Sequence, residues 1–170
     1  MFDPTAFDNV KTVLEGTVYD RDLDGTIVIT NRSDLIDIAS LNRIFSITFY
    51  STEKSIEAEM SLKADLKKLA AELLPSDDSE RMAGALISIT FRKNGLEWNE
   101  RELEIFNDQW SESRCFELRT VSSNKQPSYC EMLIQFNRTI TEDMLRDVEN
   151  MVYFSIETTD LLGVEMNGEN

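Results

Sequence analysis

Residues 44–74 constrain the fold more than any other stretch, because the spacing of their apolar residues changes partway along. Apolar and polar residues alternate over 45–50 and again over 56–62, a period of two that predicts two half-buried strands. Apolar residues then recur every three or four positions, which predicts an amphipathic helix over 63–74. A single helix over 54–74 is the alternative, because Glu, Ala, Met and Lys favour helices.

The same order of elements recurs over 116–154, where two alternating segments precede a helix predicted over 141–154. This recurrence suggests two similar halves, residues 1–75 and 83–155, each made of antiparallel strands followed by a covering helix. The alternative is that any chain of strands and covering helices would show some resemblance of this kind.

A third helix is expected at the start of the chain. Asp3 followed by Pro4 is a typical helix start, and the apolar spacing predicts a helix over 4–18. We therefore expect an α+β fold with a mostly antiparallel sheet, or two sheets, covered by the three helices. The length suits a single domain over 1–170, and the Thr-, Asp-, Gly- and Asn-rich residues 160–170 indicate a mobile tail.

The segment after residue 90 allows two interpretations. Asn94-Gly95 is the strongest turn signal in the chain and predicts a two-residue hairpin turn that pairs Phe91 with Trp98. The alternation slips after Trp98, so this interpretation needs a β-bulge in the returning strand. A short helix capped by Asn99 is the alternative, and the bulged strand is the interpretation that we favour.

The charge of the chain bears on its partners. It carries 32 acidic and 17 basic residues, a net charge of −15, and such a surface repels phosphate backbones and anionic lipids. We therefore expect neither nucleic acid nor a membrane as partner. The N-terminus has no basic segment and no apolar core typical of a signal peptide, so a cytoplasmic location is expected. Cys115 and Cys130 fall on two strands but out of register, which predicts no disulfide.

Catalytic signatures are missing from the sequence. The chain has no histidine, which excludes serine–histidine–aspartate and cysteine–histidine nucleophilic schemes. Its six glycines are not spaced to cradle a phosphate, and two cysteines without histidine argue against a zinc or iron–sulfur site. We expect a protein that is not an enzyme and that needs no cofactor.

One motif carries a metal-binding mechanism. Asp20, Asp22 and Asp24 alternate and precede Gly25, which resembles the first half of an EF-hand calcium loop. The bidentate glutamate expected at the twelfth position is replaced by Asn31. A calcium-binding module that uses the Asp20–Gly25 loop is therefore one functional hypothesis. An acidic turn that closes a helix and opens a strand is the alternative.

A second hypothesis is a small-ligand site with carboxylate and aromatic walls. Trp98, Phe106, Trp110 and Phe116 could line such a pocket. Aromatic residues at strand spacing are also typical of a core, which is the alternative.

The leading hypothesis is a protein-interaction or regulatory module. The acidity, size and element order of the chain resemble those of small α+β chaperones that bind secretion substrates as dimers. This resemblance implies a chaperone-like role with a protein partner, and no residue role is carried over from it. An antiparallel sheet must also protect its edge strands, and we expect a homodimer.

Overall fold

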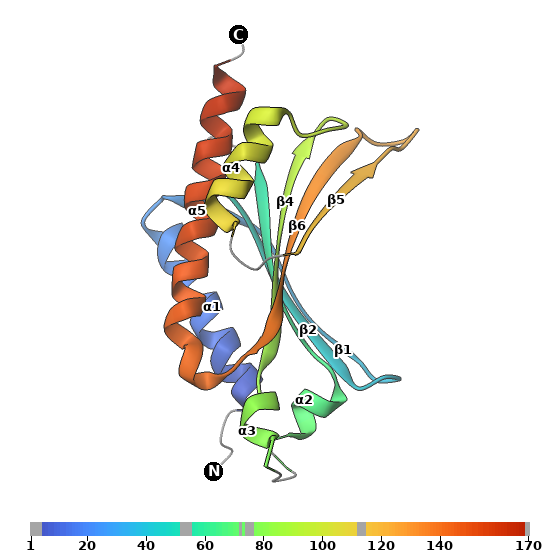
Figure 1. Ribbon diagram of the computed structural model, residues 1–170, viewed down its shortest axis with the longest axis vertical. Coiled ribbons are helices and arrows are strands. Elements are labelled where there is room, and N and C mark those ends of the chain that lie inside the picture. Colours follow the sequence, from blue (N-terminus) through green and yellow to red (C-terminus); the bar gives the residue numbers. More distant parts are fainter. Residues whose placement is uncertain (1–4, 52–55, 72, 74–76, 112–114, 169–170) are drawn as a thin grey trace.

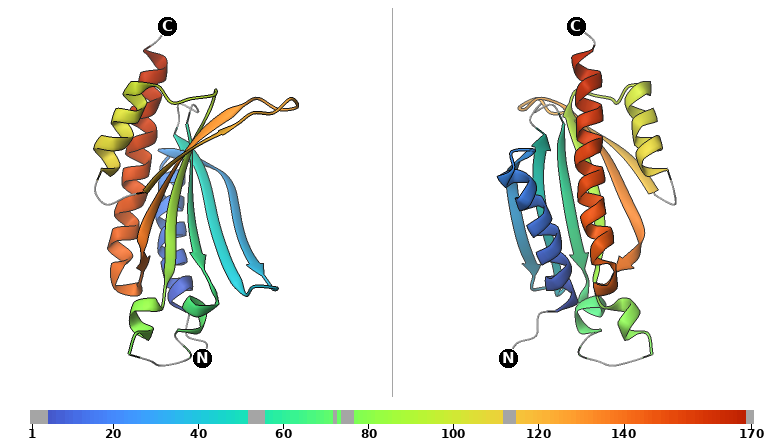
Figure 2. Two further views of the ribbon diagram at one scale, coloured as in Figure 1. Left: turned by 45° about the vertical axis from the view of Figure 1, so that its right-hand side comes forward. Right: turned by 90° about the vertical axis from the view of Figure 1, so that its left-hand side faces the viewer.

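The alternating segments form one antiparallel sheet of six strands. The structure is a computed structural model that describes residues 5–51, 56–71, 73, 77–111 and 115–168. The strand order in the sheet is β1-β2-β3-β4-β6-β5, and every neighbouring pair is antiparallel. Three long helices, α1, α4 and α5, lie on the same face of the twisted sheet (Figures 1 and 2). The predicted α+β class and antiparallel sheet are confirmed.

The elements have the following bounds. The strands are β1 (Ile27–Asp37), β2 (Asn42–Ser51), β3 (Glu57–Ala64), β4 (Ala85–Asn94), β5 (Cys115–Val121) and β6 (Tyr129–Ile140). The helices are α1 (Ala6–Leu23), α2 (Leu66–Ala70), α3 (Ser79–Met82), α4 (Glu100–Trp110) and α5 (Leu145–Asn167), with a 3-10 turn at Glu142–Met144 before α5. The described residues thus contain five α-helices where the sequence predicts three.

The core lies between the helices and one face of the sheet. Alternate residues of the strands point to this face and are buried; they include Phe45, Ile47, Phe49, Met60, Leu62, Ile89, Phe91, Met132 and Ile134. Val10 and Leu14 of α1 and Val148 and Val152 of α5 belong to the same cluster. None of the described helices covers the opposite face of the sheet, where polar residues alternate with the buried ones (Figure 2).

The predicted helix boundaries need correction. The first helix begins at Ala6, with the Thr5 side chain accepting a hydrogen bond from the Asp8 amide, and it continues to Leu23. The predicted start at Asp3 and Pro4 lies outside the described residues. In place of the helix predicted over 63–74, β3 continues to Ala64 and α2 is only five residues long.

The end of the chain also differs from the prediction. The sequence predicts a helix over 141–154 and a mobile tail over 160–170, but α5 continues to Asn167. Leu162 is completely buried on this helix, so packing stabilises turns that the Gly- and Asn-rich composition disfavours. Gly163 is likewise accommodated inside the helix.

The segment after Asn94 is a helix rather than a returning strand. The favoured bulged strand is wrong, and the alternative, a helix capped by Asn99, is right. Helix α4 follows β4 in the chain and takes the place of a strand that would pair with it. The second half of the sheet therefore has the order β4-β6-β5. The strands of the first half, β1 to β3, follow chain order instead. The proposed halves 1–75 and 83–155 therefore differ in strand order.

Two further sequence expectations concern the cysteines and membranes. Cys115 lies opposite Gln135, next to the predicted neighbour Ile134, while Cys130 lies opposite Thr120. Both thiols are free. Across the described part of the chain, no helix combines the length and the apolar character that crossing a bilayer requires.

Candidate partner-binding groove

The chain leaves the sheet at the end of β4 through a short loop. Gly95 has a φ of +117°, a conformation that glycine adopts without strain, and its amide donates to the Ser128 carbonyl at 3.0 Å. The Thr120 hydroxyl donates to the Leu96 carbonyl at 3.0 Å, which joins the loop to β5. The Asn-Gly signal therefore marks a bend that takes the chain out of the sheet and not the predicted two-residue hairpin turn, and Trp98 becomes buried.

A buried polar cluster fixes the start of α4. The Asn99 side chain accepts from the Glu102 amide, and the Glu102 carboxylate accepts from the Asn99 amide, each at 2.8 Å, which completes a capping box. The same carboxylate pairs with Lys93 Nζ of β4 at 2.5 Å. The Lys93 ammonium also lies 5.1 Å from the centre of the Trp98 ring. Glu102 is completely buried, so its ion pair with Lys93 fixes the start of α4 to β4.

Aromatic contacts then direct α4 towards β4 and α5. The Phe106 ring lies 5.3 Å from Phe91 on β4 and 4.9 Å from Trp98, the second contact being edge-to-face. At the end of the helix, Trp110 Nε1 donates to the Thr158 hydroxyl of α5 at 3.1 Å. These contacts anchor α4 to β4 and α5, and α4 lies towards the side of the sheet formed by β6 and β5, whereas α5 crosses its middle (Figure 2).

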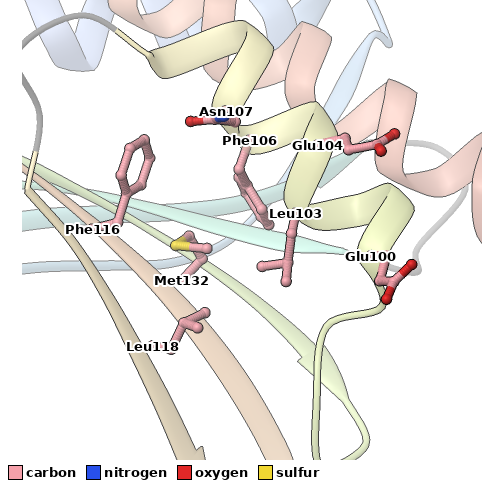
Figure 3. A pocket seen from close by; sticks show the side chains of 8 residues that line it. All are labelled: Glu100, Leu103, Glu104, Phe106, Asn107, Phe116, Leu118 and Met132. Atoms are coloured by element: carbon pink, nitrogen blue, oxygen red, sulfur yellow. The ribbon is translucent and has the colours of Figure 1, made fainter.

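An open groove of about 630 Å³ lies between α4 and β5. Figure 3 shows the side chains of β5 and β6 facing those of α4 across it. The lining residues, which define the α4–β5 groove, are Glu100, Leu103, Glu104, Phe106, Asn107, Phe116, Leu118 and Met132. Leu118 is 58% exposed and Phe116 is 38% exposed, although both point to the face of the sheet that is otherwise buried.

The lining combines apolar walls with acidic helix residues. Leu103, Phe116 and Leu118 offer apolar surface, while Glu100 and Glu104 come from the first turns of α4. Glu104 is already paired with Arg101 on the same helix at 3.1 Å, and both side chains are well exposed. Such a lining suits an apolar group that carries or adjoins a positive charge.

The two cysteine thiols lie in different surroundings. Cys130 is 1% exposed on β6, and burial raises the pKa of its thiol above the ordinary value. A raised pKa keeps the thiol protonated and makes it a poor nucleophile. Cys115 is exposed at the start of β5, where the Asn137 side-chain amide donates to its sulfur at 3.3 Å.

The four aromatic residues proposed for a ligand pocket separate into two pairs. Phe106 and Phe116 line the α4–β5 groove. Trp98 and Trp110 are only 7% and 6% exposed and pack in the core, which is the alternative considered for them.

The acidic turn does not gather its three carboxylates. Because α1 continues to Leu23, Asp20 and Asp22 lie on its last turns, about 200° apart around the helix axis. Asp24 is the C-cap residue, and its carboxylate accepts from the Thr26 amide at 3.0 Å. The Asp22 carboxylate accepts from the Ile29 amide at 3.1 Å.

This geometry does not bring the three carboxylates of the predicted calcium loop together. Within the described ranges, no group of three or more acidic or cysteine side chains is placed to hold a metal ion. Gly25 has a φ of +80° directly after the helix, a conformation typical of a glycine that ends a helix. The turn thus has the geometry of the alternative, in which Asp-Gly closes a helix and precedes a strand.

Several groove residues were missed by the sequence reasoning. Leu103, Leu118 and Met132 look like ordinary core positions, because local spacing does not show which strand lies at the edge. The available signal was Asn99 followed by Glu102, the Asn-x-x-Glu pattern of a capping box. Reading it as a helix start would have placed Leu103 and Phe106 on one helix face.

A similar protein of known function could indicate what binds in the α4–β5 groove. It has an apolar lining, two glutamates and an open side along β5. Comparisons with protein-family models, curated proteins and solved structures find no match to this chain.

Proposed function

We propose that this protein is a non-catalytic interaction module that binds an apolar segment of another polypeptide in the α4–β5 groove. The observation that carries the proposal is the exposure of Leu118 and Phe116 on the helix-covered face of the sheet. The central strands β3 and β4 bury the equivalent positions completely, as with Met60 and Ile89. Apolar surface left open beside a well-filled core is typical of an interaction site.

The charge of the protein supports a segment with basic flanking residues. Glu100 and Glu104 lie at the groove, and the whole chain has a net charge of −15. A partner with lysine or arginine beside its apolar residues would be attracted before contact and oriented on binding. This combination fits a chaperone-like role in the cytoplasm, as the resemblance in size, acidity and element order implies.

Site-specific photocrosslinking tests the proposal. A photoreactive phenylalanine analogue is placed at Asn107, an exposed residue that lines the groove, in the protein expressed in its native cells. The matched control carries the analogue at Glu149, an exposed residue of α5 away from the groove. We expect Asn107 to crosslink to apolar segments with nearby Lys or Arg, and these products to diminish in Glu100→Lys and Glu104→Lys variants.

The outcomes separate the proposal from its rivals. Identical products from Asn107 and Glu149, or none from either, would contradict groove binding. A discrete small-molecule adduct in native mass spectrometry, displaced by Leu118→Glu, would instead favour the small-ligand alternative. That alternative has support of its own, because Phe106 and Phe116 lie with Glu100 and Glu104 in one groove.

A further inference from the structure

The edge strand β5 lacks three of the devices that prevent a sheet from extending: a bulge, a proline and a lysine. Its residues from Cys115 to Thr120 are all exposed. It pairs with β6 without any register shift, so no bulge twists it away. Its sequence contains neither proline nor lysine. A regular edge of this kind is a template for another strand.

A row of alternating charges crosses the uncovered face of the sheet and ends on this strand. Glu57, Arg92, Glu131 and Arg119 are consecutive cross-strand partners on β3, β4, β6 and β5. Arg92 lies 2.5 Å from a Glu131 oxygen and 3.6 Å from a Glu57 oxygen. The row thus reads negative, positive, negative, positive, and a further strand would continue it with an acidic residue opposite Arg119.

The sequence of β5 supplies that residue when two copies are related by a two-fold axis through Leu118. Antiparallel pairing about this residue places Glu117 of each copy opposite Arg119 of the other. Leu118 then lies opposite itself, and Phe116 lies opposite Thr120. Moving the axis to Glu117 or to Arg119 would instead place two like charges opposite each other, which is unfavourable.

The geometry points to a second copy of this chain as the occupant of the β5 edge, in the register centred on Leu118. Each Glu117 already lies 2.7 Å from Arg119 of its own chain. Association therefore joins two exposed ion pairs into one cluster of four alternating charges. The interface is isologous, because the same strand contributes the same residues from both copies.

This dimer brings the two α4–β5 grooves side by side. The axis is perpendicular to the sheet, so the helices of both copies lie on one face. The exposed Phe116 and Leu118 of each copy then form a continuous apolar floor between two α4 helices. This inference concerns self-association and does not depend on which ligand the groove binds.

Charge exchange on β5 tests the register. Sedimentation equilibrium at low ionic strength should show a dimer for the wild type. Glu117→Arg and Arg119→Glu should each raise the dimer dissociation constant at least tenfold, because like charges then oppose each other. An equimolar mixture of the two variants should form heterodimers. The double exchange Glu117→Arg/Arg119→Glu should recover part of the dimer affinity, because the charges across the axis again alternate while position 119 becomes acidic opposite Glu131 of the same chain. Unchanged circular dichroism spectra would show that each variant is folded.

A disulfide trap gives an independent measurement. In a Cys115→Ser background, Leu118→Cys should form a crosslinked dimer under mild oxidation, because the two residues face each other across the axis. Thr120→Cys is the matched control and should not crosslink, since it faces Phe116. A monomeric wild type, a dimer insensitive to both charge reversals, or equal crosslinking at both positions would overturn the inference. Failure of the Asn107 photocrosslinks alone would concern only the proposed ligand.

Discussion

The two edges of the sheet are built in opposite ways. On β1, the residues that face the helices include Arg32 and Asp34, which lie opposite the buried Ile47 and Phe45 of β2. On β5, the residues that face the helices include the apolar Leu118. On the helix-covered face of the sheet, β1 therefore carries charged side chains, whereas β5 carries an exposed apolar side chain.

The helices beside the two edges also differ in whether they contact the edge strand. Helix α1 reaches over the β1 edge, where Arg32 pairs with Glu15, and Asp34 pairs with Lys11 at 2.6 Å. Strand β1 also carries a register shift after Ile29. Inward charges and bulges are known ways to stop further strands from adding to a sheet. The anchoring contacts of α4 are made to β4 and α5 instead, and a groove separates α4 from β5.

The molecule therefore protects one edge of its sheet and leaves the other open to a further strand. Both strands are equally peripheral in the sheet order. The ion pairs of β1 close its edge, whereas the open groove and the self-complementary charges of β5 make that edge a place for association.

The largest effect is expected where α4 is held in place. Glu102→Ala removes the capping box and leaves the Lys93 ammonium, on a side chain that is only 11% exposed, without its partner, so we expect a loss of about 3–5 kcal/mol in the free energy of unfolding. Urea denaturation followed by tryptophan fluorescence measures it. Glu104→Ala, on the exposed side of the same helix, should change stability by less than about 0.5 kcal/mol. Equal effects would show that the buried pair does not anchor the groove wall.

An intermediate effect is expected from the charged contacts of the closed edge. The Arg43 guanidinium donates to Asp34 of β1 and to Asp8 of α1, each at 2.8 Å, and lies 4.6 Å from the centre of the Phe7 ring. Arg43→Met should therefore lower the free energy of unfolding by about 2–3 kcal/mol. The matched change on the open edge, Arg119→Met, removes an exposed pair and should leave the stability of the monomer unchanged at low protein concentration.

Arg43→Met and Arg119→Met compare the charged contacts of the two edges of the sheet. A loss of stability as large for Arg119→Met as for Arg43→Met would remove the contrast between the edges. Both measurements are made by urea denaturation at several protein concentrations, so that association does not contribute.

The smallest effect is expected from acidification. Hydrogen bonds from Arg43 hold the pKa of the Asp34 carboxyl well below its usual range, against the opposing effect of burial, and Lys11 lowers it further. A carboxyl with a depressed pKa stabilises the fold above about pH 4, the pKa of the unfolded chain, and this contribution is lost as the pH falls below that value. Between pH 5 and 3, the wild type should lose more stability than Asp34→Asn.

The open edge again provides the control for this measurement. A hydrogen bond from Arg119 lowers the pKa of the Glu117 carboxyl, but both side chains are exposed to solvent. Glu117→Gln should therefore leave the acid dependence of monomer stability close to that of the wild type. A larger change from Glu117→Gln than from Asp34→Asn would contradict the view that β1 carries the stronger charge contacts.

Part of the candidate site was open to prediction and part was not. Phe106 and Phe116 were proposed as pocket residues from their aromatic character, and both line the groove. Trp98 and Trp110 have the same character but fill the core, because Trp98, which precedes α4, packs on Phe106, and Trp110 at the end of α4 packs on β4 and α5. The acidic loop had a convincing spacing, yet the additional turn of α1 separated Asp20 from Asp22 around the helix.

Local residue spacing was enough to predict β2, β3 and the buried side of each. Alternation with a period of two depends only on neighbouring residues, so β2 and β3 and the side of each strand that is buried could be read directly. The net charge and the absence of histidine are likewise fixed by composition. The alternation is the basis for predicting the α+β class, and the absence of histidine excludes catalytic schemes that need it.

Which strand became the open edge depended on long-range packing. Burial of Phe106 against Phe91 made 100–110 a helix, although Asn94-Gly95 also permits a hairpin. Once α4 occupied that position, β6 paired with β4 and β5 was left outermost. Strand order depends on contacts between residues far apart in the chain, and local spacing carries no record of them. The groove and the exposed edge of β5 follow from that pairing.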